Sequence, residues 1–231
     1  MIRRRLRALA RSLVFNINTV RYPLEIARIR EALDQIGEID TLLDAGAGGG
    51  HYAAVCYLRR CRNLVVVEAN PRNFAIARQT LAGSAGRTRF FSCPIEKVPL
   101  AAASVDCVTS SQVLEHIVDD NAAVAEFARL LKPGGHALVT TPTPPELFPN
   151  PEHAREGYTE PELVGLFVRN GFTHLRTDWF ITAGSVRILR WINRFGPIPR
   201  ILPLTELRES YEERKANHPS HILGLFRKNS S

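Results

Sequence analysis

The stretch LLDAGAGGG, which runs from Leu42 to Gly50, decides how this chain of 231 residues is expected to fold. An apolar run ends in a carboxylate, Asp44, and then enters a loop with glycine at alternate positions. Gly46, Gly48 and Gly50 can adopt backbone angles that other residues avoid, and they leave no Cβ in the way of a ligand. An acid delivered into such a loop before a helix is typical of a nucleoside-binding turn.

Strands and helices alternate on both sides of this loop. We expect strands at Asp40–Asp44, Leu64–Glu68, Thr88–Cys93, Val105–Thr109, His136–Thr141, Phe172–Phe180 and Ile222–Arg227. We expect helices at Tyr22–Ile36, His51–Arg60, Pro71–Leu81, Asn121–Leu131 and Glu160–Asn170. This alternation predicts an α/β fold, in which helices cover both faces of a mostly parallel sheet. The last strand is predicted to lie at an edge of that sheet.

Two segments interrupt the alternation. Six prolines between positions 142 and 161 predict a long ordered loop, of the kind that forms lids or binding loops. Residues 181–217 are predicted to be a helical insertion, which would cap a substrate pocket, mediate dimerisation into a homodimer, or simply pack on the body. The predicted organisation is a helical extension at 1–38 followed by one domain at 39–231.

The net charge of +7 is concentrated at the two ends of the chain. Residues 1–30 carry eight arginines and a single acid, whereas residues 31–184 carry more acidic than basic side chains. A nucleic-acid partner is therefore not favoured, because its groove would be expected to cross the body. The four cysteines form no CxxC pair, so we expect neither disulfides nor a metal site, and a cytoplasmic location.

The arginine-rich start of the chain has an apolar side. Ile2, Leu6, Leu9 and Leu13 would share one face of a helix. This basic N-terminal helix would lie peripherally on the inner membrane surface or pack on the body with its arginines solvated, and an organellar transit peptide of similar composition is a less favoured alternative. No window of the sequence is long and apolar enough for a membrane span.

Motifs downstream of the glycine loop separate two classes of nucleotide-binding fold. A dinucleotide-binding loop wants a third glycine where His51 stands, whereas acid-x-Gly-x-Gly-x-Gly is satisfied from Asp44 to Gly50. The segments VPL at 98–100, SVDCV at 104–108, QVLEHI at 112–117 and LKPGG at 131–135 follow in order. In residues 40–180 and the final strand, this set resembles the class I S-adenosylmethionine-dependent methyltransferases, particularly a small-molecule group that includes quinone-biosynthesis enzymes.

The resemblance implies a fold and a cofactor site. The fold would be doubly wound and Rossmann-like, with seven mostly parallel strands and an antiparallel last strand. The cofactor would be S-adenosyl-L-methionine, which leaves as S-adenosyl-L-homocysteine. Asp44 and the loop would surround its methionine part, Glu68 would bind the ribose hydroxyls, and Ala69 would lie against adenine. The residues expected to bind the cofactor are Asp44, Gly46, Ala47, Gly48, Gly50, Glu68, Ala69, Ile95, Glu96, Ser111 and Gln112.

The expected reaction is methyl transfer to an oxygen, nitrogen or carbon atom of a small molecule, with a bulky, aromatic or lipid-like acceptor as a hypothesis. A base is needed only if the acceptor must lose a proton. His116, which follows the fourth strand, is the first candidate, and His153 and Tyr158 in the proline-rich loop are alternatives. Two rival functions stay open: methylation of a protein or an RNA, and a scaffold or regulator that binds the cofactor without catalysis.

Overall fold

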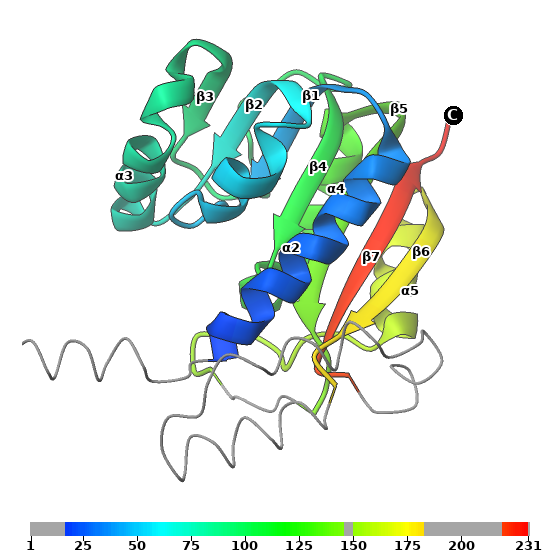
Figure 1. Cartoon of the computed structure of the whole chain (residues 1–231). Helices are drawn as coiled ribbons and strands as arrows, with labels where there is room; N and C mark the ends of the chain where they lie inside the picture. The colour runs from blue at the N-terminus through cyan, green and yellow to red at the C-terminus, as the bar shows by residue number, and fades with distance from the viewer. Residues whose placement is uncertain (1–16, 146–149, 183–218, 231) are drawn as a thin grey trace, which may run out of the picture.

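The computed structural model describes residues 17–145, 150–182 and 219–230 (Figure 1). Its strands are β1 (Ile39–Ala45), β2 (Cys61–Val67), β3 (Thr88–Phe91), β4 (Val105–Ser111), β5 (Leu131–Pro142), β6 (Phe172–Phe180) and β7 (His221–Lys228). Its helices are α2 (Ile17–Ile36), η1 (Ala53–Tyr57), α3 (Pro71–Thr80), η2 (Ala82–Arg87), η3 (Leu114–His116), α4 (Asp120–Leu130) and α5 (Glu160–Arg169).

The strands form one sheet in the order β3-β2-β1-β4-β5-β7-β6. The strands from β3 to β5 are parallel, and β7 runs antiparallel to both of its neighbours, β5 and β6. Strand order reverses between β1 and β4, so the loops after these two strands flank the crevice where ligands bind in sheets of this class. The predicted doubly wound sheet with an antiparallel last strand is confirmed.

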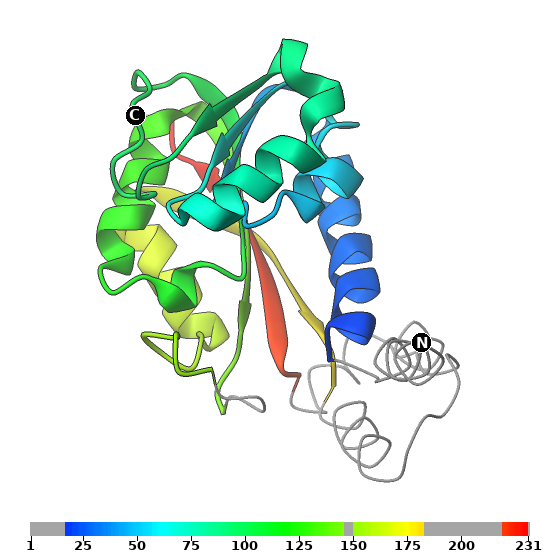
Figure 2. The ribbon, with the colours of Figure 1, turned by 90° about the vertical axis from the view of Figure 1, so that its left-hand side faces the viewer.

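Alternate residues of the central strands feed two hydrophobic cores, one on each face of the sheet. Leu43 and Val65 pack with α4 and α5, whereas their neighbours Leu42 and Leu64 pack with α2, η1 and α3. This is the period-two pattern of a strand that is buried on both faces. Figure 2 shows the resulting three layers, with the sheet between the two groups of helices.

The final strand was predicted at a sheet edge, and that prediction is wrong. β7 is hydrogen-bonded between β5 and β6, and β6 is the edge strand instead. Residues 221–226 are all buried, which is the burial expected of an interior strand and not of an edge. The first five strands are parallel, whereas β7 runs in the opposite direction between β5 and β6.

Some element boundaries also differ from the prediction. The helix expected at His51–Arg60 begins at His51 as predicted but continues as a π-helix over Ala53–Tyr57 and ends there, three residues early. The segment LKPGG was expected to precede the fifth strand, but it lies within β5. The pairing register between β4 and β5 shifts at this segment. By contrast, β6 spans the predicted range, and α3 begins with Pro71 in its first turn as expected.

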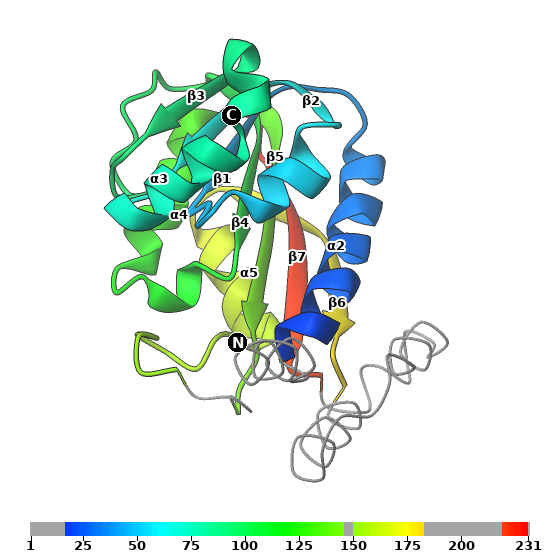
Figure 3. The same cartoon turned by 60° about the vertical axis from the view of Figure 1, so that its left-hand side comes forward.

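α2 begins at Ile17, five residues before the predicted start of the helix, and packs along β5, β6 and β7 (Figure 3). The basic helix expected before residue 17 and nearly all of the 181–217 insertion lie outside the described residues. Within the described part of the chain, no helix is long and apolar enough to span a membrane.

Candidate cofactor and acceptor site

A cavity of about 210 Å³ lies at the carboxyl ends of β1 and β4. Six of the residues predicted to bind the cofactor line this cavity: Asp44, Gly46, Ala47, Gly48, Ser111 and Gln112. Its other walls come from Arg21, Tyr22, Gly49, His51 and Tyr52. Gly50, Glu68, Ala69, Ile95 and Glu96, also predicted to bind the cofactor, do not line it.

The glycine loop adopts the backbone conformation that the sequence predicted. Gly46, Gly48 and Gly50 all have positive φ, at +78°, +54° and +79°, which disfavours other residues there. A Cβ at Gly46 would lie 2.6 Å from the methyl groups of Val113, whereas a Cβ at Gly48 would meet no protein atom within 4 Å. Gly48 therefore faces open space at the cavity, and Gly46 is needed for close packing of the loop against Val113.

Asp44 is 2% exposed and lines the cavity. Its Oδ1 atom accepts a long hydrogen bond from the Thr109 hydroxyl at 3.5 Å, and its Oδ2 atom accepts none from any residue that the structure describes. Burial, opposed by that hydrogen bond, raises the pKa of Asp44 to about 7. A buried carboxylate oxygen without a donor at a cavity wall is suited to a ligand that supplies an N–H group or a positive charge.

Glu68, at the end of β2, holds the glycine loop. Its Oε2 atom accepts from the backbone N–H of Gly48, and its Oε1 atom accepts from that of Asn70, both at 2.7 Å. The Asn70 side chain in turn caps α3. Near the expected adenine site, Ala69 is exposed and Ile95 is buried, whereas Glu96 is half-buried.

α2 forms a roof over the cavity, and a buried acid joins the two. Glu25 is fully buried and accepts hydrogen bonds from Tyr52 at 2.5 Å, from Gln112 at 3.2 Å and from the Thr140 hydroxyl. Arg21, one turn earlier, lies 3.7 Å from the Glu25 carboxylate and donates to the Gln112 side-chain oxygen at 3.1 Å. Helix α2 is thereby tied to the ends of β4 and β5 and to the segment after the glycine loop.

Two further features distinguish the carboxyl ends of the central strands. The rings of Tyr22, His51 and Tyr52 lie against one another, with centroids 5.0–5.7 Å apart. Gln112 has φ = +57°, a left-handed conformation that is uncommon outside glycine and that occurs at functional sites. The α2 residues Arg21, Tyr22 and Glu25 were not predicted to belong to the site. The available signal was Glu25, an acid one turn before Ile29 on the apolar face of the helix.

The two histidine candidates lie side by side near this edge. The rings of His116 and His153 have centroids 4.5 Å apart and are nearly perpendicular. Next to them, Glu115 is 1% exposed, and burial raises the pKa of its carboxyl to about 8.

A third histidine, His221 at the start of β7, is also buried. Burial lowers its pKa to about 3, and the charge of Arg21 acts in the same direction. His221 is therefore a neutral, buried histidine.

Tyr158, the third catalytic candidate, has a structural position. Its side chain is 4% exposed, and its hydroxyl donates to Asp120 Oδ2 at 2.7 Å. Arg155 donates to the same hydroxyl at 2.6 Å. Gly157 carries this segment against β5, since a Cβ there would lie 2.1 Å from the Pro142 carbonyl oxygen. This burial and pairing argue against Tyr158 as a residue that faces the acceptor.

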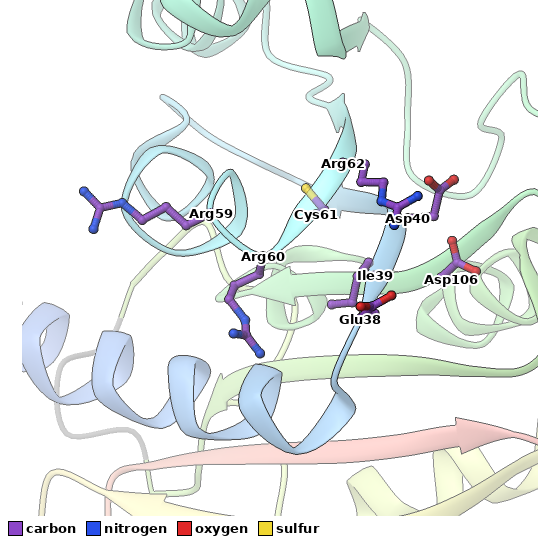
Figure 4. Close-up of a pocket in the computed structure, with 8 residues that line it drawn as sticks. All are labelled: Glu38, Ile39, Asp40, Arg59, Arg60, Cys61, Arg62 and Asp106. Carbon is purple, nitrogen blue, oxygen red and sulfur yellow. The ribbon is translucent and has the colours of Figure 1, made fainter.

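A second pocket, of about 430 Å³, lies at the opposite edge of the sheet. It is formed at the starts of β1 and β2, where Glu38, Asp40 and Asp106 share its rim with Arg59, Arg60 and Arg62 (Figure 4). Ligands in this class of sheet bind outside the carboxyl ends of the strands, and this pocket is at the amino ends. It is therefore not the cofactor site.

Comparisons with known proteins agree with this geometry. Residues 43–139 match the model of a family described as Methyltransferase domain. A probable S-adenosylmethionine-dependent methyltransferase of Mycobacterium tuberculosis is 32% identical over 137 residues, which cover 57% of this chain and 48% of that protein. A ubiquinone biosynthesis O-methyltransferase of Sinorhizobium medicae is 32% identical over 102 residues, which cover 43% of this chain and 40% of that protein.

The matched part thus spans less than half of each of these curated relatives. Among solved structures, geranyl diphosphate methyltransferase in complex with S-adenosylmethionine has a TM-score of 0.64 and 16% identity. The alignment covers 90% of this chain and 86% of that one, and at this identity it supports the fold alone. Residues 43–139 thus match a methyltransferase domain family, and the glycine loop and the sheet order are consistent with the fold of the S-adenosylmethionine-dependent methyltransferases to which the chain is similar.

Proposed function

We propose that this protein transfers a methyl group from S-adenosylmethionine to an oxygen, nitrogen or carbon atom of a small molecule. The observation that carries the proposal is Asp44, whose buried Oδ2 atom lacks a donor at the wall of the glycine-loop cavity. The α-ammonium group of the cofactor is a donor of the charge and kind that this oxygen lacks. The residues present therefore fit the cofactor that the family implies.

The remaining cofactor residues have complementary roles in this proposal. The open side of Gly48 would leave room for the methionine part. Each oxygen of Glu68 already accepts one backbone hydrogen bond. A carboxylate has about four acceptor positions, so Glu68 can still accept from the ribose hydroxyls.

The acceptor would bind beneath α2, next to the ends of β4 and β5. The methyl carbon of the cofactor is already electrophilic, so the protein has mainly to orient the acceptor and exclude water. Arg21, Tyr22 and Gln112 border the cavity from the roof and from β4 and would do both.

Isothermal calorimetry with S-adenosylmethionine and S-adenosylhomocysteine tests the cofactor role. Gly48→Val should abolish binding because its side chain would occupy the open side of the loop. Gly37→Val is the matched control, since Gly37 also has positive φ (+86°) and open space around its Cβ position but lies in the turn before β1. Both variants carry a similar backbone strain of about 1–2 kcal/mol, and only Gly48→Val should lose the ligand. Absence of binding by the wild type, or equal binding by the two variants, would refute the proposal.

We also propose a peripheral membrane contact through the first residues of the chain. It is supported by the arginines and the apolar face formed by Ile2, Leu6, Leu9 and Leu13 in the sequence. Co-sedimentation with anionic liposomes should pellet the full chain and not a version that begins at Ile17, the first residue of α2. Equal pelleting of the two proteins would contradict it.

A further inference from the structure

Three potential metal ligands meet beside the acceptor side of the site. Glu115 and His116 belong to η3, which follows β4, and His153 belongs to the loop that follows β5. One potential ligand atom from each of these residues lies within 4.8 Å of the other two. Glu115 is buried, and the two histidines are half-buried, so the cluster has an inner and an outer side.

Backbone hydrogen bonds hold the two segments together. The N–H groups of Ala154 and Arg155 both donate to the Glu115 carbonyl oxygen, at 2.8 and 3.3 Å. The Arg155 guanidinium also donates to the carbonyl oxygens of Leu114 and Ile117, at 2.9 and 2.8 Å. The histidines therefore stand on a framework that is fixed by their neighbours and does not depend on a ligand, as a preorganised site requires.

The hydrogen bond of His116 sets its tautomer. The Nδ1 atom lies 3.1 Å from the Glu152 carbonyl oxygen, and a carbonyl oxygen can only accept. Nδ1 therefore carries the proton, and the lone pair of Nε2 is available. Histidines that bind metals characteristically donate their other ring N–H to a backbone carbonyl or a carboxylate in this way.

Glu115 would provide the carboxylate ligand of the cluster. Its carboxylate is 1% exposed and accepts from the Thr141 hydroxyl over a long 3.4 Å. Burial of an ionised carboxylate is costly unless it is paired or coordinates a metal. A cation between Glu115 and the two imidazoles would supply that partner.

We propose that Glu115, His116 and His153 bind a divalent transition-metal ion of the zinc type. Two imidazoles and one carboxylate form a donor set found in catalytic zinc sites, where three protein ligands leave a position open. Magnesium and calcium prefer all-oxygen surroundings and fit this set poorly. No metal was predicted from the spacing of the cysteines, and Glu115 and His153 are 38 residues apart in the sequence, so only the fold brings them together.

An ion at this place would hold an oxygen of the acceptor, which favours a substrate with a hydroxyl or carboxylate group. That role rests on the proposed methyl transfer, whereas binding of the ion does not. The proposed ion site and the cofactor cavity lie at the same end of the sheet, since Gln112 lines the cavity and is only three residues before Glu115.

The test uses the full chain after treatment with a chelator. Zinc should bind as a single tight ion per chain in competition with a chromophoric chelator, cobalt should give the absorption bands of a nitrogen- and oxygen-ligated ion, and magnesium should not compete. Glu115→Gln and His153→Gln should each weaken zinc binding at least roughly 10–100-fold, the cost of losing even an outer-shell partner. His174→Gln is the matched control, because His174 lies on β6 and its ring contacts Thr177 and Phe226.

Calorimetry with S-adenosylhomocysteine on the metal-free proteins gives a separate measure of folding and of the cofactor site. Binding of the nucleoside by Glu115→Gln and His153→Gln, together with loss of zinc, would support the metal site. No tight zinc in the wild type, or zinc binding by these variants equal to that of His174→Gln, would overturn it. A failure of the proposed methyltransferase function would appear instead as loss of nucleoside binding in the wild type.

Discussion

Replacement of Asp44 by asparagine should change how stability depends on pH. Burial raises the pKa of this carboxyl from 3.8 to about 7 in the folded protein, whereas the unfolded chain keeps the lower value. The unfolded state therefore releases the proton first as the pH rises. The folded state is penalised progressively from about pH 4 upward, and the penalty becomes constant above about pH 7.

The size of this penalty follows from the two pKa values. A pKa difference of one corresponds to about 1.36 kcal/mol, so complete ionisation costs the folded protein about 4 kcal/mol. Between about pH 5 and about pH 7.5 the penalty should grow by about 2–3 kcal/mol. Asp44→Asn carries no charge and escapes it, so its free energy of unfolding relative to the wild type should rise by this amount over the same interval.

Urea denaturation of the two proteins at a series of pH values measures this difference directly. Glu115, whose pKa burial raises to about 8, adds a dependence of the same sign, but it is present in both proteins and cancels in the comparison. S-adenosylhomocysteine should flatten the wild-type curve, since its ammonium group would lower the pKa of Asp44. If the two stability curves run parallel over this range, the description of Asp44 as a buried, poorly paired acid is incorrect.

Three further variants probe the surroundings of the cavity. Gly46→Ala should lose about 2–4 kcal/mol of stability, because the added Cβ would overlap Val113 and the residue has a positive φ. Urea denaturation measures the loss. A loss no larger than that of Gly37→Ala would contradict the close packing of Gly46 against Val113. Glu25→Gln should lower the free energy of unfolding by about 2–4 kcal/mol, because the buried carboxylate joins α2 to the sheet. Proteolysis within α2 should become faster for the same reason. An unchanged cleavage rate would show that Glu25 does not hold α2 on the sheet. Tyr158→Phe should cost about 1–2 kcal/mol and leave affinity for S-adenosylhomocysteine unchanged in calorimetry, so weaker binding would contradict a purely structural role for Tyr158.

Local sequence patterns predicted most of the fold. The apolar run before Asp44 and the glycines after it specify a strand and a tight turn without help from distant residues, and the strand from Phe172 to Phe180 has the predicted limits. The location of β7 could not be predicted in the same way, because pairing partners depend on the whole sheet. Its continuous apolar run, ILGLF from Ile222, did carry a signal, since strands buried on both faces lack alternation.

The site residues likewise fall into those that local motifs predict and those that only the fold brings together. Asp44, Gly48 and Gln112 belong to motifs that are read within a few residues, and the structure places them around one cavity. Arg21 reaches Gln112 across 91 residues of sequence, through packing of an amphipathic helix whose partner the sequence does not specify. The histidines were both recognised as candidates, but their proximity depends on hydrogen bonds between two loops that only the folded chain brings together.

The interior location of β7 has a consequence for synthesis of the protein. Among the described strands, β7 is the last to leave the ribosome, yet β6 pairs only with it. Until β7 pairs with it, β5 presents an unsatisfied edge of backbone groups. A chain that lacks β7 would therefore leave β6 without its strand partner and β5 with an open edge, an arrangement that promotes pairing between chains.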